Sequence, residues 1–263
     1  MSKASIEFTN ACNHARALFA KYCSEPAPKD VIAKLRWEMS GVHTFLLDGV
    51  QNAYNLADTI PPNEHQNFAF YCYCITQNID RHHHVEEEHI FPQLEPEFKT
   101  DVIDEHAAFH QTLADLDDYL RQVLGIQEQN PDMDTISPKF KKGIPYDAEK
   151  LKRYLEQLSG PLITHLEHEI EWLDPERLRA CGVTPEKVKP IFAQVEQHIK
   201  ESIKPQSLLV FAAYHIPPYC QFPEMPWVLL KVLVPWVFWW KHRASWKYIP
   251  DYSKAPFGAL QKV

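Results

Sequence analysis

The chain has 263 residues, enough for one large domain or two small ones with a sizeable hydrophobic core. Hydrophobic residues make up 45% of it and only seven residues are glycine, a composition that favours helices over a β-sandwich. The formal net charge of −8 argues against a surface that binds nucleic acid.

Cysteine usage and the apolar segments indicate a cytoplasmic protein. The six cysteines have neither CxxC spacing nor the density of a disulfide-stabilised secreted domain, so we expect reduced thiols. The N-terminus lacks the apolar core of a signal peptide. The most apolar segment, residues 225–240, contains Lys231 and two internal prolines, and it is shorter than the roughly 20 residues that span a bilayer. We therefore expect no transmembrane segment.

Helical periodicity, interrupted by prolines and polar loops, dominates the chain to about residue 203. A first helix is predicted over residues 5–23, before Pro26 and Pro28. Pro92 is expected to end or kink the second of the long helices that follow. We predict four of these long helices, at residues 30–59, 63–91, 101–124 and 147–173.

The remaining segments complete an all-α architecture. Residues 125–145 are predicted to form a surface loop, and a further helix is predicted over residues 185–203. Beyond Lys204 the chain contains eight prolines and five of its seven tryptophans. We predict an antiparallel four-helix bundle with an N-terminal helix and a Pro/Trp-rich C-terminal extension that packs on it. The corresponding parts are residues 1–28, 29–174 and 175–263.

Pairs of potential metal ligands recur at a spacing of four residues. The stretch from Arg81 to Pro92 contains three consecutive histidines followed by three consecutive glutamates. Residues four apart on a helix point the same way. Three such pairs on separate helices indicate a metal site inside the bundle. The pairs are His82 with Glu86, His106 with His110, and His165 with Glu169.

Helical phase separates inward from outward candidates. At about 100° per residue, the apolar stripe of the second long helix centres close to Glu86. Measured from His82, His83 points about 100° away and His84 points to the opposite side. We therefore predict His82 and Glu86 as the inward pair. His43 and the candidates on the other helices also lie within apolar stripes, where several kcal/mol would be lost unless a metal coordinates them.

Each candidate also has a simpler interpretation. His43 alone is more often a hydrogen-bonded core histidine. Residues 82–84 could form an exposed patch, and residues 86–88 an exposed charged surface. His106 and His110 could be a half-buried polar pair. It is improbable that all of these simpler interpretations are correct at once. We therefore favour one metal centre built from His43, His82, Glu86, His106, His110, His165 and Glu169.

The composition of this ligand set restricts the metal. Five histidines and two carboxylates are too many for a structural zinc ion, which takes four ligands. Imidazole ligands exclude an oxygen-only calcium or magnesium site. A ferritin-like site would need two Glu-x-x-His motifs, and this chain has one, from Glu86 to His89. Two imidazole-rich, carboxylate-bridged ions, most naturally iron, fit the set.

The order of these residues resembles the hemerythrin family and, within it, the HHE cation-binding domain. The second helix of that domain typically has the pattern His-His-x-x-Glu-Glu-x-x-Ile-Phe-Pro, here residues 82–92. Residues 105–110 resemble its third helix, and the likeness covers about residues 30–174. The tail resembles those of fungal-type HHE proteins in its Pro226-Trp227 and Val234-Pro235-Trp236 segments.

The resemblance implies a di-iron site with a bridging oxo or hydroxo group. Glu86 and Glu169 would bridge the two ions. The iron held by His43 and His82 would keep an open position for O2 or another small diatomic ligand. Glu169 follows its histidine by four residues, as in other HHE domains, whereas the original hemerythrins have five. The other iron would take His106, His110 and His165.

Two classes of function follow from the resemblance. One is an oxidoreductase, an oxidase or oxygenase that activates O2 and oxidises an unknown small molecule. The other is a non-enzymatic protein that binds, stores or senses O2, iron or NO. The C-terminal extension favours the enzyme, because a carrier needs only the bundle. Besides packing on the bundle, the extension could form a lid over a substrate pocket or an interfacial membrane anchor. No pattern indicates the oligomeric state.

Overall fold

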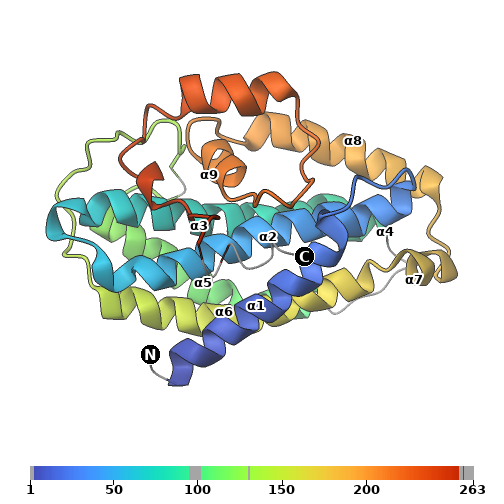
Figure 1. Ribbon diagram of the computed structural model, residues 1–263, viewed down its shortest axis with the longest axis horizontal. Coiled ribbons are helices and arrows are strands. Elements are labelled where there is room, and N and C mark those ends of the chain that lie inside the picture. The colour runs from blue at the N-terminus through green and yellow to red at the C-terminus, as the bar shows by residue number, and fades with distance from the viewer. Residues whose placement is uncertain (1–2, 95–101, 130, 255–256, 258–263) are drawn as a thin grey trace.

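The structure, a computed structural model, describes residues 3–94, 102–129, 131–254 and 257. Helices and turns make up this part of the chain, and it contains no β-strand, so the predicted all-α class is confirmed (Figure 1). The longest helices run side by side along the long axis of the molecule.

Four long helices form the central bundle. They are α2 (Val31–Leu56), α3 (His65–Val85), α5 (Val102–Leu124) and α6 (Ala148–Trp172). Each packs against the next along the chain, and α6 returns to pack against α2, which closes the ring. The hydrophobic core of large aliphatic and aromatic side chains lies between them. The predicted four-helix bundle is therefore present, with helix ends shifted by a few residues.

The N-terminal ends of two bundle helices are fixed by aspartate caps. The Asp30 side chain accepts a hydrogen bond from the backbone N–H of Ile32, 3.1 Å away, at the start of α2. Asp147 accepts one from the N–H of Lys150, at 2.9 Å, at the start of α6. Such caps satisfy N–H groups that have no partner within the helix. They place His43 and His165 at defined heights in the bundle.

The second long helix departs from the single helix predicted over residues 63–91. Two short 3-10 turns, η1 (Ala57–Thr59) and η2 (Pro62–Glu64), precede α3. At its far end a π-helical turn, η3 (Glu86–Ile90), leads into the short helix α4 (Phe91–Leu94). Pro92 lies in α4 directly after the π-helical turn, and because it has no N–H it cannot donate to a carbonyl of that turn.

The N-terminal helix and the C-terminal extension cover the bundle from two sides. Helix α1 (Lys3–Cys23) packs against α2 and α6. After α6 come α7 (Pro175–Ala180) and α8 (Pro185–Ser202), and α8 packs against α2 and η3. Three shorter elements complete the described chain: α9 (Leu208–Tyr214), η4 (Leu229–Phe238) and η5 (Trp246–Tyr248).

The extension contributes to the core. Helix α9 and η5 both pack against α3, and η4 packs against α9. Leu208, Val210, Phe211 and Trp246 are fully buried or nearly so. No helix in the described ranges is long and apolar enough to cross a membrane.

Candidate metal centre

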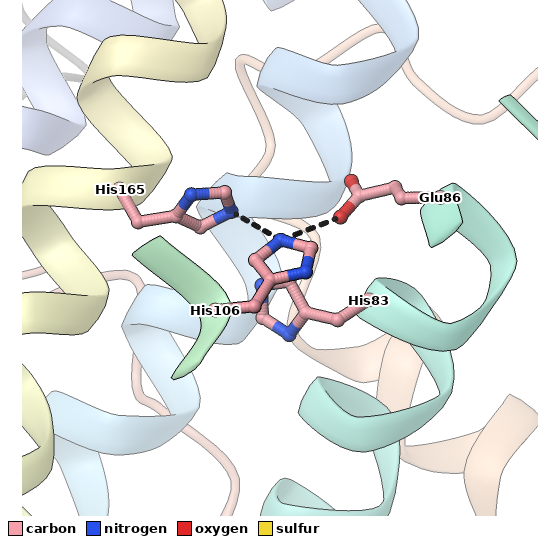
Figure 2. A group of neighbouring side chains, drawn as sticks. All are labelled: His83, Glu86, His106 and His165. Atoms are coloured by element: carbon pink, nitrogen blue, oxygen red, sulfur yellow. Dashed lines mark hydrogen bonds and ion pairs between the residues drawn. The ribbon is translucent and has the colours of Figure 1, made fainter. Parts of the chain in front are cut away.

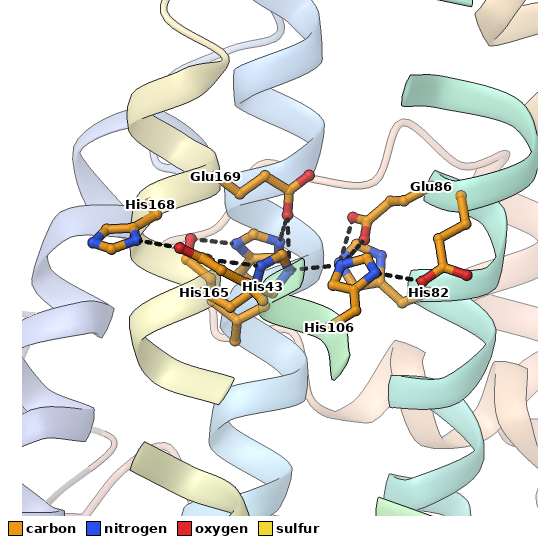
Figure 3. A network of polar contacts seen from close by, with 10 residues as sticks. His43, His82, Glu86, His106, His165, His168 and Glu169 are labelled. Carbon is orange, nitrogen blue, oxygen red and sulfur yellow. Dashed lines mark hydrogen bonds and ion pairs between the residues drawn. The ribbon is translucent and has the colours of Figure 1, made fainter. Parts of the chain in front are cut away.

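Two groups of potential ligands meet inside the bundle. One contains His83, Glu86, His106 and His165, and its ligand atoms lie within 4.8 Å of one another (Figure 2). The other, equally compact, contains His43, His82, Glu86 and Glu169 (Figure 3). Glu86 belongs to both groups. The helices α2, α3, α5 and α6 all contribute, with Glu86 itself in η3.

Close contacts connect the side chains within each group. In the first, His106 Nε2 lies 3.1 Å from His165 Nε2 and 3.7 Å from Glu86 Oε2. In the second, His43 Nε2 lies 3.1 Å from Glu169 Oε2. Glu86 Oε1 lies 2.9 Å from His82 Nε2, so the two oxygens of this carboxylate face the two groups.

Most of these ligand atoms are buried without a hydrogen-bond partner. His43, Glu86, His165 and Glu169 are fully buried. The contacts of His43 with Glu169 and of His82 with Glu86 are short but lack the angles of a hydrogen bond. Native proteins rarely leave so many buried polar atoms unpaired, because each costs free energy. Imidazole nitrogens with carboxylate oxygens are a donor set for transition metals, so these residues fit a pair of metal ions.

Residues 36–176, more than half of the chain, match the model of the family described as Hemerythrin HHE cation binding domain. The chain belongs to this family. The match includes all seven residues of the two ligand groups.

One relative extends the similarity beyond the HHE domain. "Dimeric xanthone biosynthesis cluster protein R11" from Cryptosporiopsis sp. (strain 8999) is 25% identical over 232 residues. The alignment covers 82% of this chain and 78% of the relative, so it includes part of the C-terminal extension or the N-terminal helix as well as the bundle. No solved structure matches the chain.

A second layer of acceptors orients the histidines of the HHE domain. His43 Nδ1 donates to the backbone carbonyl of Leu166, 3.0 Å away. His106 Nδ1 lies 2.6 Å from Glu87 Oε1, and His165 Nδ1 lies 3.4 Å from Glu105 Oε2. An acceptor at Nδ1 holds the proton there and leaves the Nε2 lone pair free for a metal. These three rings therefore direct Nε2 towards the shared interior.

Glu105 has a second histidine partner. His168 Nδ1 lies 2.8 Å from Glu105 Oε1, on the half-exposed side of the centre (Figure 3). Glu105, which lies on α5, therefore contacts both His165 and His168 on α6. Sequence reasoning identified neither Glu87 nor Glu105 as part of the centre. The one available signal was the position of Glu105 immediately before His106.

Burial sets the protonation states in the centre. It lowers the pKa of His43, His82 and His165 to about 3, and it lowers the pKa of His83 well below the ordinary range. The imidazoles are therefore neutral at pH 7, which is the form that binds metals. Burial, together with the nearby Glu169 carboxylate, raises the pKa of Glu86 well above its usual value. A bound cation would reverse this effect and stabilise the carboxylate.

His83 differs from its predicted outward orientation. It is 6% exposed, and its ring centroid lies 4.6 Å from that of His106 and 4.8 Å from that of Phe109. The prediction placed the centre of the apolar stripe close to Glu86 but compared the neighbouring histidines with His82 instead of with this centre. Glu86 lies about 40° beyond His82, and His83 lies about 60° beyond Glu86. Both histidines thus flank the centre of the stripe, and both face inward.

His110 also differs from its expected place. It is exposed and lies outside both ligand groups, whereas His106, one turn earlier on α5, is buried. The buried face of α5 extends from Leu113 through Phe109 to Val123 and centres about 60° to one side of His106. His110 lies about 40° to the other side, so it is about 100° from the centre of that face. The other six predicted ligands all belong to the two groups.

Proposed function

We propose that this HHE protein holds two iron ions and binds and activates O2 to oxidise a small molecule. One observation carries the proposal: Glu86 presents one oxygen to each ligand group, with Oε1 towards His82 and Oε2 towards His106. A carboxylate shared between two sets of histidines is the arrangement that holds two ions side by side. A single mononuclear site would leave half of the buried donors unused.

The residues that would hold each ion follow from the two groups. His83, His106 and His165 would hold one ion, and His43, His82 and Glu169 the other, with Glu86 between them. The choice of iron rests on the family and on the mixed imidazole and carboxylate donors. When bound, iron ions supply the one-electron steps that O2 chemistry requires.

The protein's own residues keep the centre dry and prearranged. The ring of Phe19 lies 5.3 Å from that of His43, and Phe109 contacts both His83 and His106. These apolar neighbours exclude water, which strengthens every electrostatic interaction inside the site. Glu87 and Glu105 hold protons on the outward nitrogens of His106 and His165. The ligand lone pairs are thus fixed before any ion binds.

The relative supports an enzymatic role. Its printed name assigns it to a biosynthesis cluster for dimeric xanthones, which are small molecules. By the same likeness we propose a small-molecule oxidation for this chain. The contact of α8 with η3 places the extension beside the turn that carries Glu86, where it can shape access to the centre.

A second function is favoured by the burial of the centre. Four of the seven ligand residues are fully buried, which suits a diatomic molecule better than a larger substrate. A protein of this kind would bind, store or sense O2, iron or NO without oxidising an organic molecule.

Metal analysis followed by O2 titration tests both functions. Protein from iron-replete cells should contain two iron ions per chain, and Glu86→Gln should lose at least one of them. One zinc ion and no iron per chain would overturn the proposal. Anaerobically reduced protein should then consume O2 irreversibly if it is an oxidase. A non-enzymatic protein should instead release O2 under vacuum and show no O2 consumption in the presence of a pool of candidate small-molecule substrates.

A further inference from the structure

Most of the exposed large apolar residues of the described chain are concentrated in one short segment of the extension. Nine large hydrophobic residues of the described chain are exposed, and six of them lie between residues 227 and 240. Trp227, Trp236 and Trp240 are 68%, 70% and 54% exposed. An indole exposed to this extent leaves a large apolar area in water, and three together form a patch that marks an interaction site.

Helix η4 has two distinct apolar faces. One face packs inward through Leu229, Val234 and Phe238, of which Val234 is 2% exposed. The outer face is formed by residues at spacings of four and five, which is the repeat of a π-helix. These outer residues are Val232, Trp236 and Val237 in η4 itself, with Val228 and Trp240 just beyond its two ends. A soluble surface helix normally carries polar residues at such positions.

The position of η4 leaves its outer face unobstructed. The orange-red helix along the top edge of Figure 1 is η4, outermost in this view and nearly parallel to the long axis of the molecule. Helix α9 lies beneath it and connects it to the bundle. A helix placed in this way can lie flat against a plane, with its inner face held by the protein.

The segment that carries the patch is positively charged, unlike the whole chain. Residues 225–250 contain three lysines, one arginine and no acidic residue, although the chain has a net charge of −8. Lys247 is paired with Glu64 at 2.6 Å, and Lys241 donates to the backbone carbonyl of Asp134. Lys231 and Arg243 are exposed, and the Arg243 guanidinium lies 5.6 Å from the centroid of the Trp240 ring.

We infer that η4 is an interfacial anchor that binds the surface of an anionic lipid bilayer. Tryptophan prefers the boundary between lipid headgroups and acyl chains, where its ring is buried and its N–H remains hydrated. An exposed helix with an apolar face and flanking cations is the pattern of proteins that lie on a membrane without crossing it. The cations Lys231 and Arg243 favour anionic headgroups, which the rest of this acidic protein repels.

Vesicle flotation with the full-length, metal-loaded protein tests this inference. The protein should float with vesicles of phosphatidylcholine and phosphatidylserine, less so with phosphatidylcholine alone, and less so at high salt. The variant W227S/W236S/W240S should bind at least about a hundredfold more weakly, because three indoles no longer enter the interface. K231Q/R243Q should bind about thirtyfold more weakly to anionic vesicles only. Ile6→Ser with Ile199→Ser, exposed isoleucines on α1 and α8, is the matched control and should bind like the native protein.

A second measurement does not depend on variants. Tryptophan emission of the native protein should shift to shorter wavelength on binding and be quenched by bromine-labelled lipids. Flotation of the triple tryptophan variant at the native level would overturn the inference, as would failure of the native protein to float with anionic vesicles. A concentration-dependent dimer that the triple variant loses, without vesicle binding, would instead assign the patch to a second copy of the chain.

Discussion

Two neighbouring histidines on α3 illustrate how finely the centre depends on helical phase. His82 and His83 lie on either side of Glu86, and each belongs to a different ligand group. The two ions of the proposed centre would thus be bound by consecutive residues of one helical turn. His110, by contrast, is turned away by the orientation of α5. The iron content of single-residue variants can therefore distinguish these positions.

His83→Ala should lose about one iron ion per chain, whereas His110→Ala should retain both. The first removes a buried ligand and leaves Glu86 short of a cation, and the second removes an exposed side chain. Iron per chain, measured by elemental analysis of the purified variants, checks this. His84→Ala, also exposed, is the matched control on α3 and should retain both ions. Loss of iron from His110→Ala with retention in His83→Ala would contradict the orientation of both helices.

A titrating residue far from the ligand groups contributes to acid sensitivity. His242 is 2% exposed, stacks on Phe70 with a centroid distance of 4.1 Å, and has no hydrogen-bond partner at either nitrogen. Burial, with a smaller contribution from Lys241, lowers its pKa to about 3. As pH falls, the unfolded state binds a proton at this histidine near its ordinary pKa of about 6.5, whereas the native state binds it only near pH 3. The free energy of unfolding therefore decreases as pH falls from about 6.5 towards 3.

His242→Phe should remove this dependence while preserving the stacked ring. Relative to the variant, the native protein should lose about 1.4 kcal/mol of unfolding free energy per pH unit below about pH 6.5. Denaturant unfolding of both proteins at pH 7, 6 and 5 measures the difference. Parallel pH profiles for the two proteins would show that His242 does not titrate on unfolding. Metal-site histidines are common to both proteins and cancel in the comparison.

At the scale of elements, the helix starts follow local sequence and the helix ends follow tertiary contacts. The aspartates Asp30 and Asp147 precede apolar repeats and could be recognised as caps. The π-helical turn at residues 86–90 could not be predicted, because one extra residue per turn has no compositional signal. The division of the chain at residues 28 and 174 stays a prediction, since α1 and α8 both pack on bundle helices.

Removal of the α6 cap should destabilise the protein without affecting the metal centre. Asp147→Ala leaves the backbone N–H of Lys150 without its partner and should cost about 1 kcal/mol of unfolding free energy. Asp147→Asn keeps an acceptor at the same place and should cost a few tenths of that. Chemical denaturation measures both values, and iron content should be unchanged in each. Equal stability of the Ala and Asn variants would contradict the capping role.

At the scale of the whole molecule, the sequence predicts the bundle better than it predicts the extension. The inward positions of His43, His82 and His165 were predicted from the 3.6-residue repeat, whereas His83 was wrongly assigned to the outside. The extension has no long repeat, so the burial of Phe211 and Trp246 and the exposure of Trp236 depend on packing partners distant in sequence. Packing of the extension on the bundle was predicted, with an interfacial anchor as one alternative, but which of its tryptophans are exposed could not be predicted.

A chain truncated after Lys204 should fail to form a stable bundle. The truncated chain loses Phe211 and Trp246, which cover α3, so apolar core surface becomes exposed to water. The stabilisation lost in this way is about 5 kcal/mol or more, which is comparable to the whole free energy of unfolding of a domain. Phe211→Ala in the full chain should cost about 3–5 kcal/mol and serves as the intermediate case. Thermal unfolding followed by circular dichroism ranks the three proteins. A cooperative transition of the truncated chain at the native midpoint would show that the extension is dispensable.

The convergence of ligands from four helices has a consequence for the life of the protein in the cell. The two bound iron ions would join α2, α3, α5 and α6 at one point. Iron would therefore act as a cross-link between helices that otherwise enclose unpaired polar atoms. A chain made during iron starvation should open more often and be degraded sooner. Pulse-chase labelling should show a half-life that lengthens with iron supply, and Glu86→Gln should be short-lived at every iron level. The amount of this protein in the cell would then depend on how much iron was available when the chain folded.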